Sequence, residues 1–409
     1  MIIKSSKILS VNRLLICLFI FSCFFPCVTF LPSVTDSQPY AFVFSLLLMF
    51  LYFERKIIID FFYLFIVVLY SVLLLFFHKI DSMAIRSLYC YMSMFFISYI
   101  TYRTFHLFND SFYKIYKSIV FIWFIVGFIQ TFIEPDFLYF LVARNLKSSS
   151  LSGGRGVIAL MTEPAGYGQM CLCFIIIGYL NFEKKYKMKL IYFLLIIQLI
   201  FFAKSSTYIF VFILSFILFY FYKIIFNKDV YSIAFVCVLL LSFYFVLPIV
   251  LDSFLDYRIG YLLRNLFNNP SEFIASDGSG QIRICHIIFS FYGFIENYGM
   301  PHGYGMFFPY LDSVHLNYSF SETVSTSSDH VRILSNIGSV LFELGIIGLI
   351  PFYILARSFY KLRTRDVNVV FVLILFLILL TTSALFSLAI IPFVFGNVIY
   401  LSHRIEECS

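Results

Sequence analysis

The chain has 409 residues, of which 61% are apolar, 21% are aromatic and only 12% are charged. Soluble globular proteins have about 45–50% apolar and about 25% charged residues, so this composition excludes several water-soluble domains. It also excludes a disordered chain. A nucleic-acid-binding protein is excluded because the net charge of +7 comes without a basic run outside short loops.

The apolar residues form continuous runs of about twenty residues, whereas a porin-like barrel needs alternating segments of about ten. The sequence therefore predicts an all-α polytopic integral membrane protein. Windows of about 19 residues, compared with a hydrocarbon core about 30 Å thick, predict twelve spans. In chain order they are 14–32, 40–53, 57–77, 83–101, 115–133, 157–181, 190–203, 206–226, 230–251, 333–356, 367–381 and 384–400.

An alternative for the last two spans is one long tilted helix over 367–400, which would give eleven spans and move the C-terminus to the other side. On the first interpretation the chain has three parts. Residues 1–251 form spans one to nine with short loops, 252–332 form a large outer loop, and 333–409 form the last three spans with a short tail.

Basic residues predict the orientation. Of the 29 Lys and Arg residues, 19 fall on one side, and the positive-inside rule puts this side, with both termini, in the cytoplasm. Arginine binds phosphate through two parallel hydrogen bonds, so an excess of arginine on the opposite face indicates an anionic ligand there. That outer set has three lysines, Lys79, Lys147 and Lys204, and seven arginines, Arg86, Arg144, Arg155, Arg258, Arg264, Arg283 and Arg332.

The outer loop 252–332 is long enough to be either functional or disordered. Its pattern predicts two amphipathic helices, near 254–267 and 281–298, followed by a glycine-rich turn, Gly299 to Gly305. Four arginines stand against eight acidic residues, so we expect the arginines to bind phosphate as individual groups rather than as an electrostatic funnel. Its seven tyrosines suit either a membrane interface or stacking on sugar rings.

A second outer loop, 134–156, carries Arg155 between glycines and runs into Glu163-Pro164. A glutamate in a span is costly and is by default a functional candidate. Pro164, Gly166 and Gly168 would interrupt the start of that helix and expose backbone groups that must line a cavity. The alternative is a structural Glu163 paired with one of the outer arginines.

Four motifs stand in order along residues 140–350. They are the glycine-flanked Arg155 followed by Glu163-Pro164; Lys204-Ser-Ser-Thr207 at a tight outer turn; Arg283 opening a loop helix that ends at Gly299, Gly303 and Gly305; and Glu343-Leu-Gly345-Ile-Ile-Gly348. On these the chain resembles the O-antigen polymerase (Wzy) group, within the O-antigen ligase/polymerase superfamily of membrane glycosyltransferases. The spacings from Arg155 to Gly166 and from Arg283 to Gly299 are similar to those of some polymerases, while the flanking spans match only in hydropathy.

The resemblance implies a metal-independent, cofactor-free enzyme of the bacterial inner membrane that works on the periplasmic side, with a chain-length regulator as partner. It would transfer an oligosaccharide from undecaprenyl pyrophosphate, with inversion, onto another lipid-linked repeat unit. Fixed cations must stabilise the leaving pyrophosphate, and the acceptor hydroxyl needs a base. The expected catalytic residues are Arg155, Arg283, and His330 or Glu163 as base; the expected substrate-binding residues are Arg258, Arg264, Arg332, Tyr304 and Lys204.

Ligase relatives carry a His-Asn pair where this chain has Leu334, Ser335 and Asn336, which favours a polymerase over a ligase. His302 and His315 lack a third ligand at useful spacing, so no metal site is expected. The remaining alternative is a flippase or another transporter. Transporters tend to have internal repeats and ionisable groups near the midplane, whereas here only Asp60 is predicted to be embedded, near a cytoplasmic end.

Overall fold

A computed structural model describes residues 2–29, 37–52, 58–77, 81–142, 156–182, 187–227, 278–315, 333–363, 366–382 and 386–408. Within these ranges the chain is helical apart from loops and one isolated antiparallel bridge between Val28 and Val142. The first helices are α1 (Ile2–Phe24), α2 (Tyr40–Tyr52), α3 (Ile59–Leu75), α4 (Ser82–Phe132), α5 (Pro164–Phe182), α6 (Met188–Ile197) and α7 (Ser206–Asn227). The later helices are α11 (Gly278–Glu296), α12 (Phe307–His315), α14 (Asn336–Leu344), α15 (Ile350–Arg363), α16 (Val369–Thr382) and α17 (Ile390–Cys408).

Five helical segments are long and apolar enough to cross a membrane: Ser82–His106, Phe112–Phe132, Pro164–Phe182, Ser206–Phe226 and Asn336–Arg363. Shorter apolar helices accompany them. A bilayer core offers backbone groups no water, so a chain this apolar crosses it as helices that satisfy their own hydrogen bonds. The described part of the chain is thus that of a helical membrane protein, and the predicted span 230–251 lies outside it.

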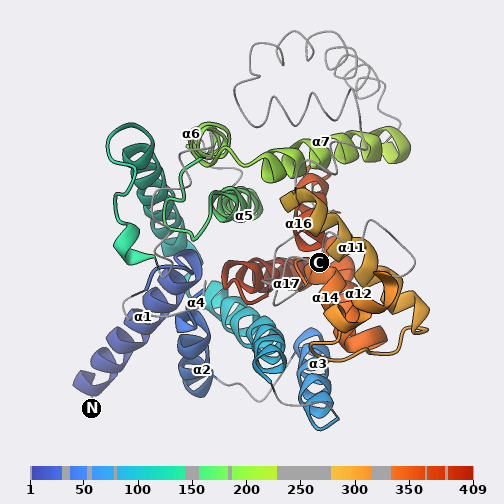
Figure 1. Ribbon diagram of the computed structural model, residues 1–409. Helices are drawn as coiled ribbons and strands as arrows, with labels where there is room; N and C mark the ends of the chain where they lie inside the picture. The colour runs from blue at the N-terminus through green and yellow to red at the C-terminus, as the bar shows by residue number, and fades with distance from the viewer. Residues whose placement is uncertain are drawn as a thin grey trace.

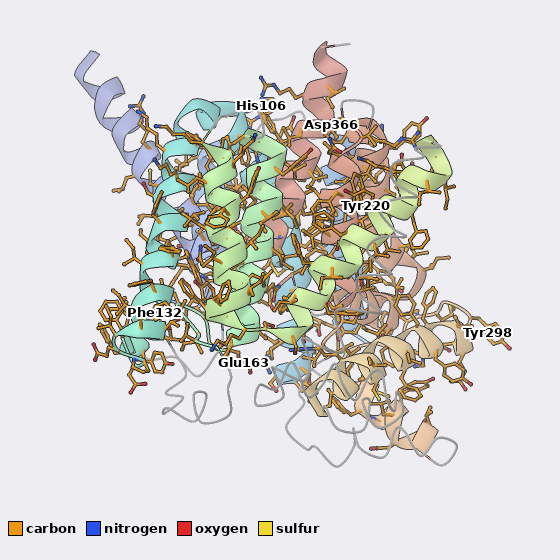
Figure 2. All side chains as sticks on the ribbon, turned by 90° about the horizontal axis from the view of Figure 1, so that it is seen from above. His106, Phe132, Glu163, Tyr220, Tyr298 and Asp366 are labelled. Atoms are coloured by element: carbon orange, nitrogen blue, oxygen red, sulfur yellow. The ribbon has the colours of Figure 1, made fainter. Side chains whose placement is uncertain are left out.

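Two predicted spans share one helix. The 51 residues of α4 would extend about 76 Å if straight, far more than a core of about 30 Å. Asp81, directly before α4, faces Gly305, at which an added Cβ would lie 3.7 Å from the Asp81 carboxylate. In Figure 2 Phe132 lies at the same end of the bundle as Glu163 and Tyr298, and His106 lies at the opposite end. The helix therefore reverses direction between its two apolar halves.

We call the end with Phe132, Glu163 and Tyr298 the outer end, and the end with His106 and Asp366 the inner end (Figure 2). The last two helices also run between these ends. α16 begins just after Asp366, and near the end of α17 the Tyr400 ring lies 5.0 Å from that of His106. α16 and α17 are therefore antiparallel, and the single tilted helix over 367–400 is wrong.

Two further differences from the predicted spans have local causes. α1 ends at Phe24 rather than at residue 32, because Pro26 has no backbone N–H to continue the helix. α5 begins at Pro164 rather than at residue 157, because Pro is favoured at the first helical position. The loop helix predicted over 281–298 corresponds to α11.

α17 lies at the centre of the bundle (Figure 1), where it packs against α4, α5 and α15. Aromatic rings fill the contact, with Phe393 of α17 next to Phe24, Phe105 and Phe112. Gly396 allows close approach, since a Cβ there would overlap the backbone of Ser98 in α4. Small residues at such crossings let membrane helices gain van der Waals contact. This core holds the outer-end loops in position.

Candidate functional site

The segment 156–163 crosses the outer end before the chain enters α5. Gln130 of α4 holds this segment. Its side chain accepts from the Ala159 N–H at 2.7 Å and donates to the Ala159 carbonyl at 3.0 Å and to that of Phe137 at 2.7 Å. The Val157 N–H donates to the Phe202 carbonyl at 2.9 Å, and a Cβ at Gly156 would overlap the Ala203 carbonyl. Gly156, and with it the chain that follows Arg155, therefore abuts the π-helical turn Gln198–Ala203.

Glu163 lies directly before α5, exposed at the outer end, instead of inside the span predicted over 157–181 (Figure 2). Its backbone carbonyl accepts from the Tyr167 N–H at 3.2 Å in the first turn. A carboxylate at this position is favoured by the positive end of the helix dipole. The side chain is therefore accessible from the outer side without the cost of burial in the hydrocarbon core.

Lys204 and Arg283 are both close to the start of α7, Lys204 in sequence and Arg283 through a hydrogen bond. Lys204 follows the π-helical turn with a left-handed backbone (φ 44°), and α7 begins two residues later. Arg283, from α11, donates from Nη1 to Oγ1 of Thr207 in the first turn of α7 at 2.6 Å. The buried Nε of Arg283 has no hydrogen-bond partner among the described residues. We call Lys204, Thr207 and Arg283 the outer cationic turn.

Of the five arginines expected in the site, Arg283 is the one within the described residues. Arg155, Arg258, Arg264 and Arg332, and also His330, lie outside the described residues. Tyr304, expected to bind substrate, is 5% exposed, and its hydroxyl donates to the Ser71 carbonyl of α3 at 2.6 Å. Burial raises the pKa of Tyr304 well above its usual range. Its geometry is that of an anchor between the loop and α3.

His286, one turn after Arg283 on α11, was not singled out from the sequence. Its ring is buried against Phe307, and Nδ1 accepts from the Leu334 N–H at 3.0 Å. A neutral imidazole that accepts at Nδ1 carries its proton on Nε2, so the Nδ1 lone pair is occupied and is not available as a base. His286 fixes the start of α14 against α11, which no local signal in the sequence reveals.

The second loop histidine is also structural. The ring of His302 stacks on Phe342 with centroids 4.2 Å apart, and Nε2 donates to the Gly293 carbonyl at 2.9 Å. Within the described ranges, no group of three His, Cys, Asp or Glu side chains is arranged to hold a metal ion.

A cavity of about 290 Å³ opens between the first turns of α4 and α14. We call it the outer cavity. Glu343, 8% exposed, accepts from Oγ of Ser87 at 2.9 Å and from the Tyr91 hydroxyl at 2.6 Å. The residues of its wall that matter here are Arg86, Tyr89, Cys90, Tyr91, Asn336 and Glu343.

The outer cavity adjoins the other outer elements through backbone contacts. The Ile346 N–H donates to the Gly299 carbonyl at 2.8 Å, which joins the two glycine motifs at Gly299 and Gly345.

No protein-family model matches the chain, and no curated protein matches its sequence.

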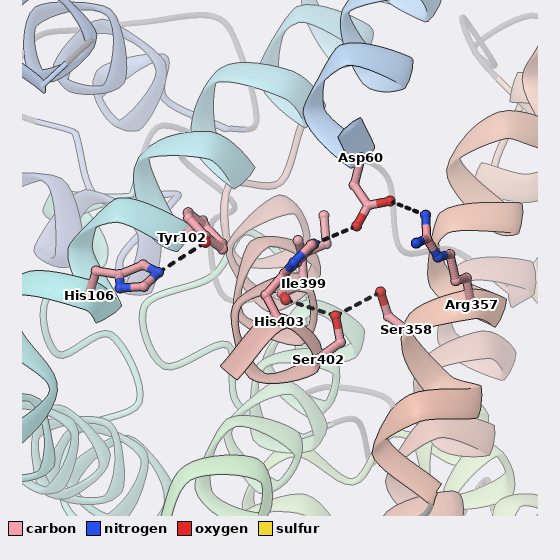
Figure 3. A network of polar contacts seen from close by, with 8 residues as sticks. All are labelled: Asp60, Tyr102, His106, Arg357, Ser358, Ile399, Ser402 and His403. Atoms are coloured by element: carbon pink, nitrogen blue, oxygen red, sulfur yellow. Dashed lines mark hydrogen bonds and ion pairs between the residues drawn. The ribbon is translucent and has the colours of Figure 1, made fainter. Parts of the chain in front are cut away.

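The embedded acid predicted from the sequence, Asp60, belongs to a cluster at the inner end (Figure 3). Its carboxylate lies 2.8 Å from Nε2 of His403 and 3.4 Å from Nη1 of Arg357, and Ser402 approaches Ser358 beside them. Transporter sites place ionisable groups near the midplane. A carboxylate paired on both oxygens at one end of three helices fits the role of a structural link.

Proposed function

We propose that this protein is a membrane glycosyltransferase of the O-antigen polymerase type. It transfers an oligosaccharide from undecaprenyl pyrophosphate to another lipid-linked repeat unit, on the periplasmic side of the bacterial inner membrane and without a metal. A chain-length regulator would be its protein partner. The product would be an O-antigen or a related surface polysaccharide.

The observation that supports this proposal most is the contact between Arg283 and Thr207. It brings together two motifs that are 76 positions apart in the chain. The motif that begins at Arg155 approaches the same place, because Gly156, the next residue, abuts Ala203, and Ala203 directly precedes Lys204. Three sequence motifs that carry cations therefore meet at one end of the bundle.

The chemistry of the transfer explains why cations are needed there. Negative charge develops on the pyrophosphate as the glycosidic bond breaks, and preorganised donors stabilise that charge. A guanidinium has five N–H donors, of which Arg283 uses one on Thr207. The others, with Lys204 and the N-terminal amides of α7, suit phosphate oxygens.

The acceptor hydroxyl must lose a proton to a base within hydrogen-bond reach. His330 is our first choice for that base and Glu163 the second. Glu163 is exposed at the outer end, beside the segment that Gln130 holds. Arg155, Arg258, Arg264 and Arg332 would add to the binding of the donor.

Deletion of the gene in its host tests the proposal. If the protein is the polymerase, lipopolysaccharide gels of the deletion strain should show core that bears a single repeat unit. Loss of a ligase or of a flippase would leave bare core instead. Bare core in the deletion strain would refute the proposed function.

Complementation with site variants tests the outer cationic turn. We expect Arg283→Ala and Arg155→Ala to give the single-repeat pattern at normal protein level, since loss of one such donor costs about 100- to 1000-fold in rate. Arg283→Lys keeps the charge but loses the planar fork, and should restore only a faint, short ladder. Lys147→Ala is the control and should leave the ladder intact. A full ladder in both alanine variants would refute the proposal that these two arginines bind the pyrophosphate.

A further inference from the structure

Asn336 opens α14 and lines the outer cavity with only 2% of its surface exposed. Its Nδ2 has no hydrogen-bond partner among the described residues. A buried donor without a partner is destabilising, and native proteins leave few of them. An apolar occupant such as a lipid tail would not remove that cost, whereas an oxygen-bearing ligand would.

Glu343, two turns after Asn336 on α14, lines the same cavity and supplies acceptors. A carboxyl group accepts hydrogen bonds at both oxygens and has capacity for more than one at each, and Ser87 and Tyr91 each donate one, to different oxygens. No cation lies within ion-pair distance of Glu343 among the described residues. The carboxylate can therefore accept a further hydroxyl hydrogen.

Charge and size restrict the ligand. Glu343 brings hydrogen-bond acceptors to the cavity wall, which favours a ligand that carries hydroxyl donors over a phosphate. A volume of about 290 Å³ is at the lower end of ligand pockets, about 300–1,000 Å³. Tyr89 and Tyr91 add aromatic wall to this pairing of a donor with an acceptor. These properties fit one hydroxyl-bearing ring.

We propose that the outer cavity binds a neutral sugar ring of the acceptor glycan. The Asn336 amide donates to a sugar oxygen and the Glu343 carboxylate accepts from a sugar hydroxyl. This subsite rests on the proposed function and adds the acceptor side to it. The contact from Leu334 to His286 holds the start of α14 against the helix that carries Arg283, so the acceptor lies beside the site for the donor pyrophosphate.

A natural thiol makes the subsite measurable. Cys90 lines the outer cavity. Full-length protein in lipid nanodiscs is treated with N-ethylmaleimide, and alkylation of each cysteine is followed by mass spectrometry. The probe is the repeat-unit oligosaccharide released by mild acid from the lipid-linked intermediates of the host, at millimolar concentration. We expect it to slow alkylation of Cys90 at least threefold and to leave unchanged the alkylation of a reference thiol, Tyr298→Cys, at a position that is 96% exposed at the outer end.

Variants connect the protection to the two polar groups. Asn336→Leu keeps the number and branching of the side-chain heavy atoms but has no donor, and should abolish the protection. Glu343→Gln keeps the shape and should weaken it, which provides a second test if Asn336→Leu folds poorly. The matched control is Asn397→Leu, because Asn397 is also fully buried with no amide partner among the described residues but does not line the cavity. It should keep full protection.

The outcomes separate this inference from the proposed function. Absence of protection in the unmodified protein, with a single-repeat phenotype in the deletion strain, overturns the subsite and leaves the polymerase standing. Protection with a bare-core phenotype supports a sugar subsite in a protein of another function. Protection of Cys90 by inorganic pyrophosphate or by undecaprenol, and not by the oligosaccharide, overturns the assignment to a neutral sugar.

Discussion

Asp60 is the residue at which charge and burial conflict most directly. Its side chain is 2% exposed, and burial of a lone carboxylate in an apolar interior is prohibitively costly. His403 and Arg357, from α17 and α15, resolve the conflict because each approaches a different carboxylate oxygen. One acidic side chain thereby connects three helices at the inner end (Figure 3).

Replacement of Asp60 should reveal the strength of this link. Breaking a buried ion pair costs about 3–5 kcal/mol, and we expect the lower end because Arg357 is 37% exposed and can turn to solvent. Asp60→Ala should therefore lower the melting temperature in detergent more than Asp60→Asn, which retains one acceptor for His403. Equal melting temperatures for Asp60→Ala and the unmodified protein would contradict the link.

For single residues, the sequence predicted which side chains could belong to a site, but not which side chains they contact. Arg283 and the Lys204–Thr207 turn were each recognisable from the sequence, but their contact joins helices separated by 76 positions. His286 and Asn336 gave no signal because a lone polar residue in an amphipathic helix has the same pattern whether it faces a cavity or a neighbour. The sequence predicts that Tyr304 binds substrate, yet its hydroxyl donates to the Ser71 carbonyl.

The break between α14 and α15 is the element on which the outer end depends. The chain passes through Gly345 with φ of 62° and ψ of −142°, close to a region of backbone space that only glycine adopts readily. A Cβ there would lie 2.5 Å from the Gly299 carbonyl. The two glycines therefore mark one backbone crossing, which explains why both motifs carry glycine.

Gly345→Ala should disrupt this crossing. Backbone strain of about 1–3 kcal/mol and the overlap with Gly299 act together, so we expect a fall of several degrees in melting temperature and lower protein level. Gly166→Ala is the matched control, since only the flexible end of Met161 must move, from a Cβ contact of 2.8 Å. Equal melting temperatures for the two variants would contradict a steric requirement for glycine at position 345.

Element boundaries were least predictable where polar side chains override hydropathy. The window 157–181 is apolar enough for a span, but Gln130 captures the backbone of Ala159 and keeps 156–163 out of the helix. A hydropathy window averages the composition of one segment, so it contains no information on a hydrogen bond from a side-chain amide of another helix, such as that of Gln130. The long span 333–356 was predicted as one element, and its central turn at Gly345 was not.

For the molecule as a whole, the polar clusters separate by end. The outer cationic turn and Glu163 share one end with Tyr298, while Asp366 and His106 occupy the other (Figure 2). The distribution of 19 of the 29 basic residues on one side predicts that the end with Asp366 faces the cytoplasm.

Cysteine labelling of spheroplasts tests this sidedness. Tyr298 is 96% exposed at the outer end, so a membrane-impermeant maleimide should label Tyr298→Cys in intact spheroplasts. Arg404, exposed near the end of α17, should yield labelling of Arg404→Cys only after the membrane is permeabilised. The unmodified protein gives the background of the natural cysteines. The reverse pattern would overturn the orientation and, with it, a periplasmic active side.

The helical membrane class and the five long apolar helical segments could be predicted from the sequence, because a bilayer selects for local composition, which a window of about twenty residues contains. The contacts that make a site are of another kind. Arg283 meets Thr207, and Glu343 meets Tyr91 from 252 positions away, only because helices pack in one arrangement. That arrangement depends on shape and close approach between helix surfaces, which no local window contains.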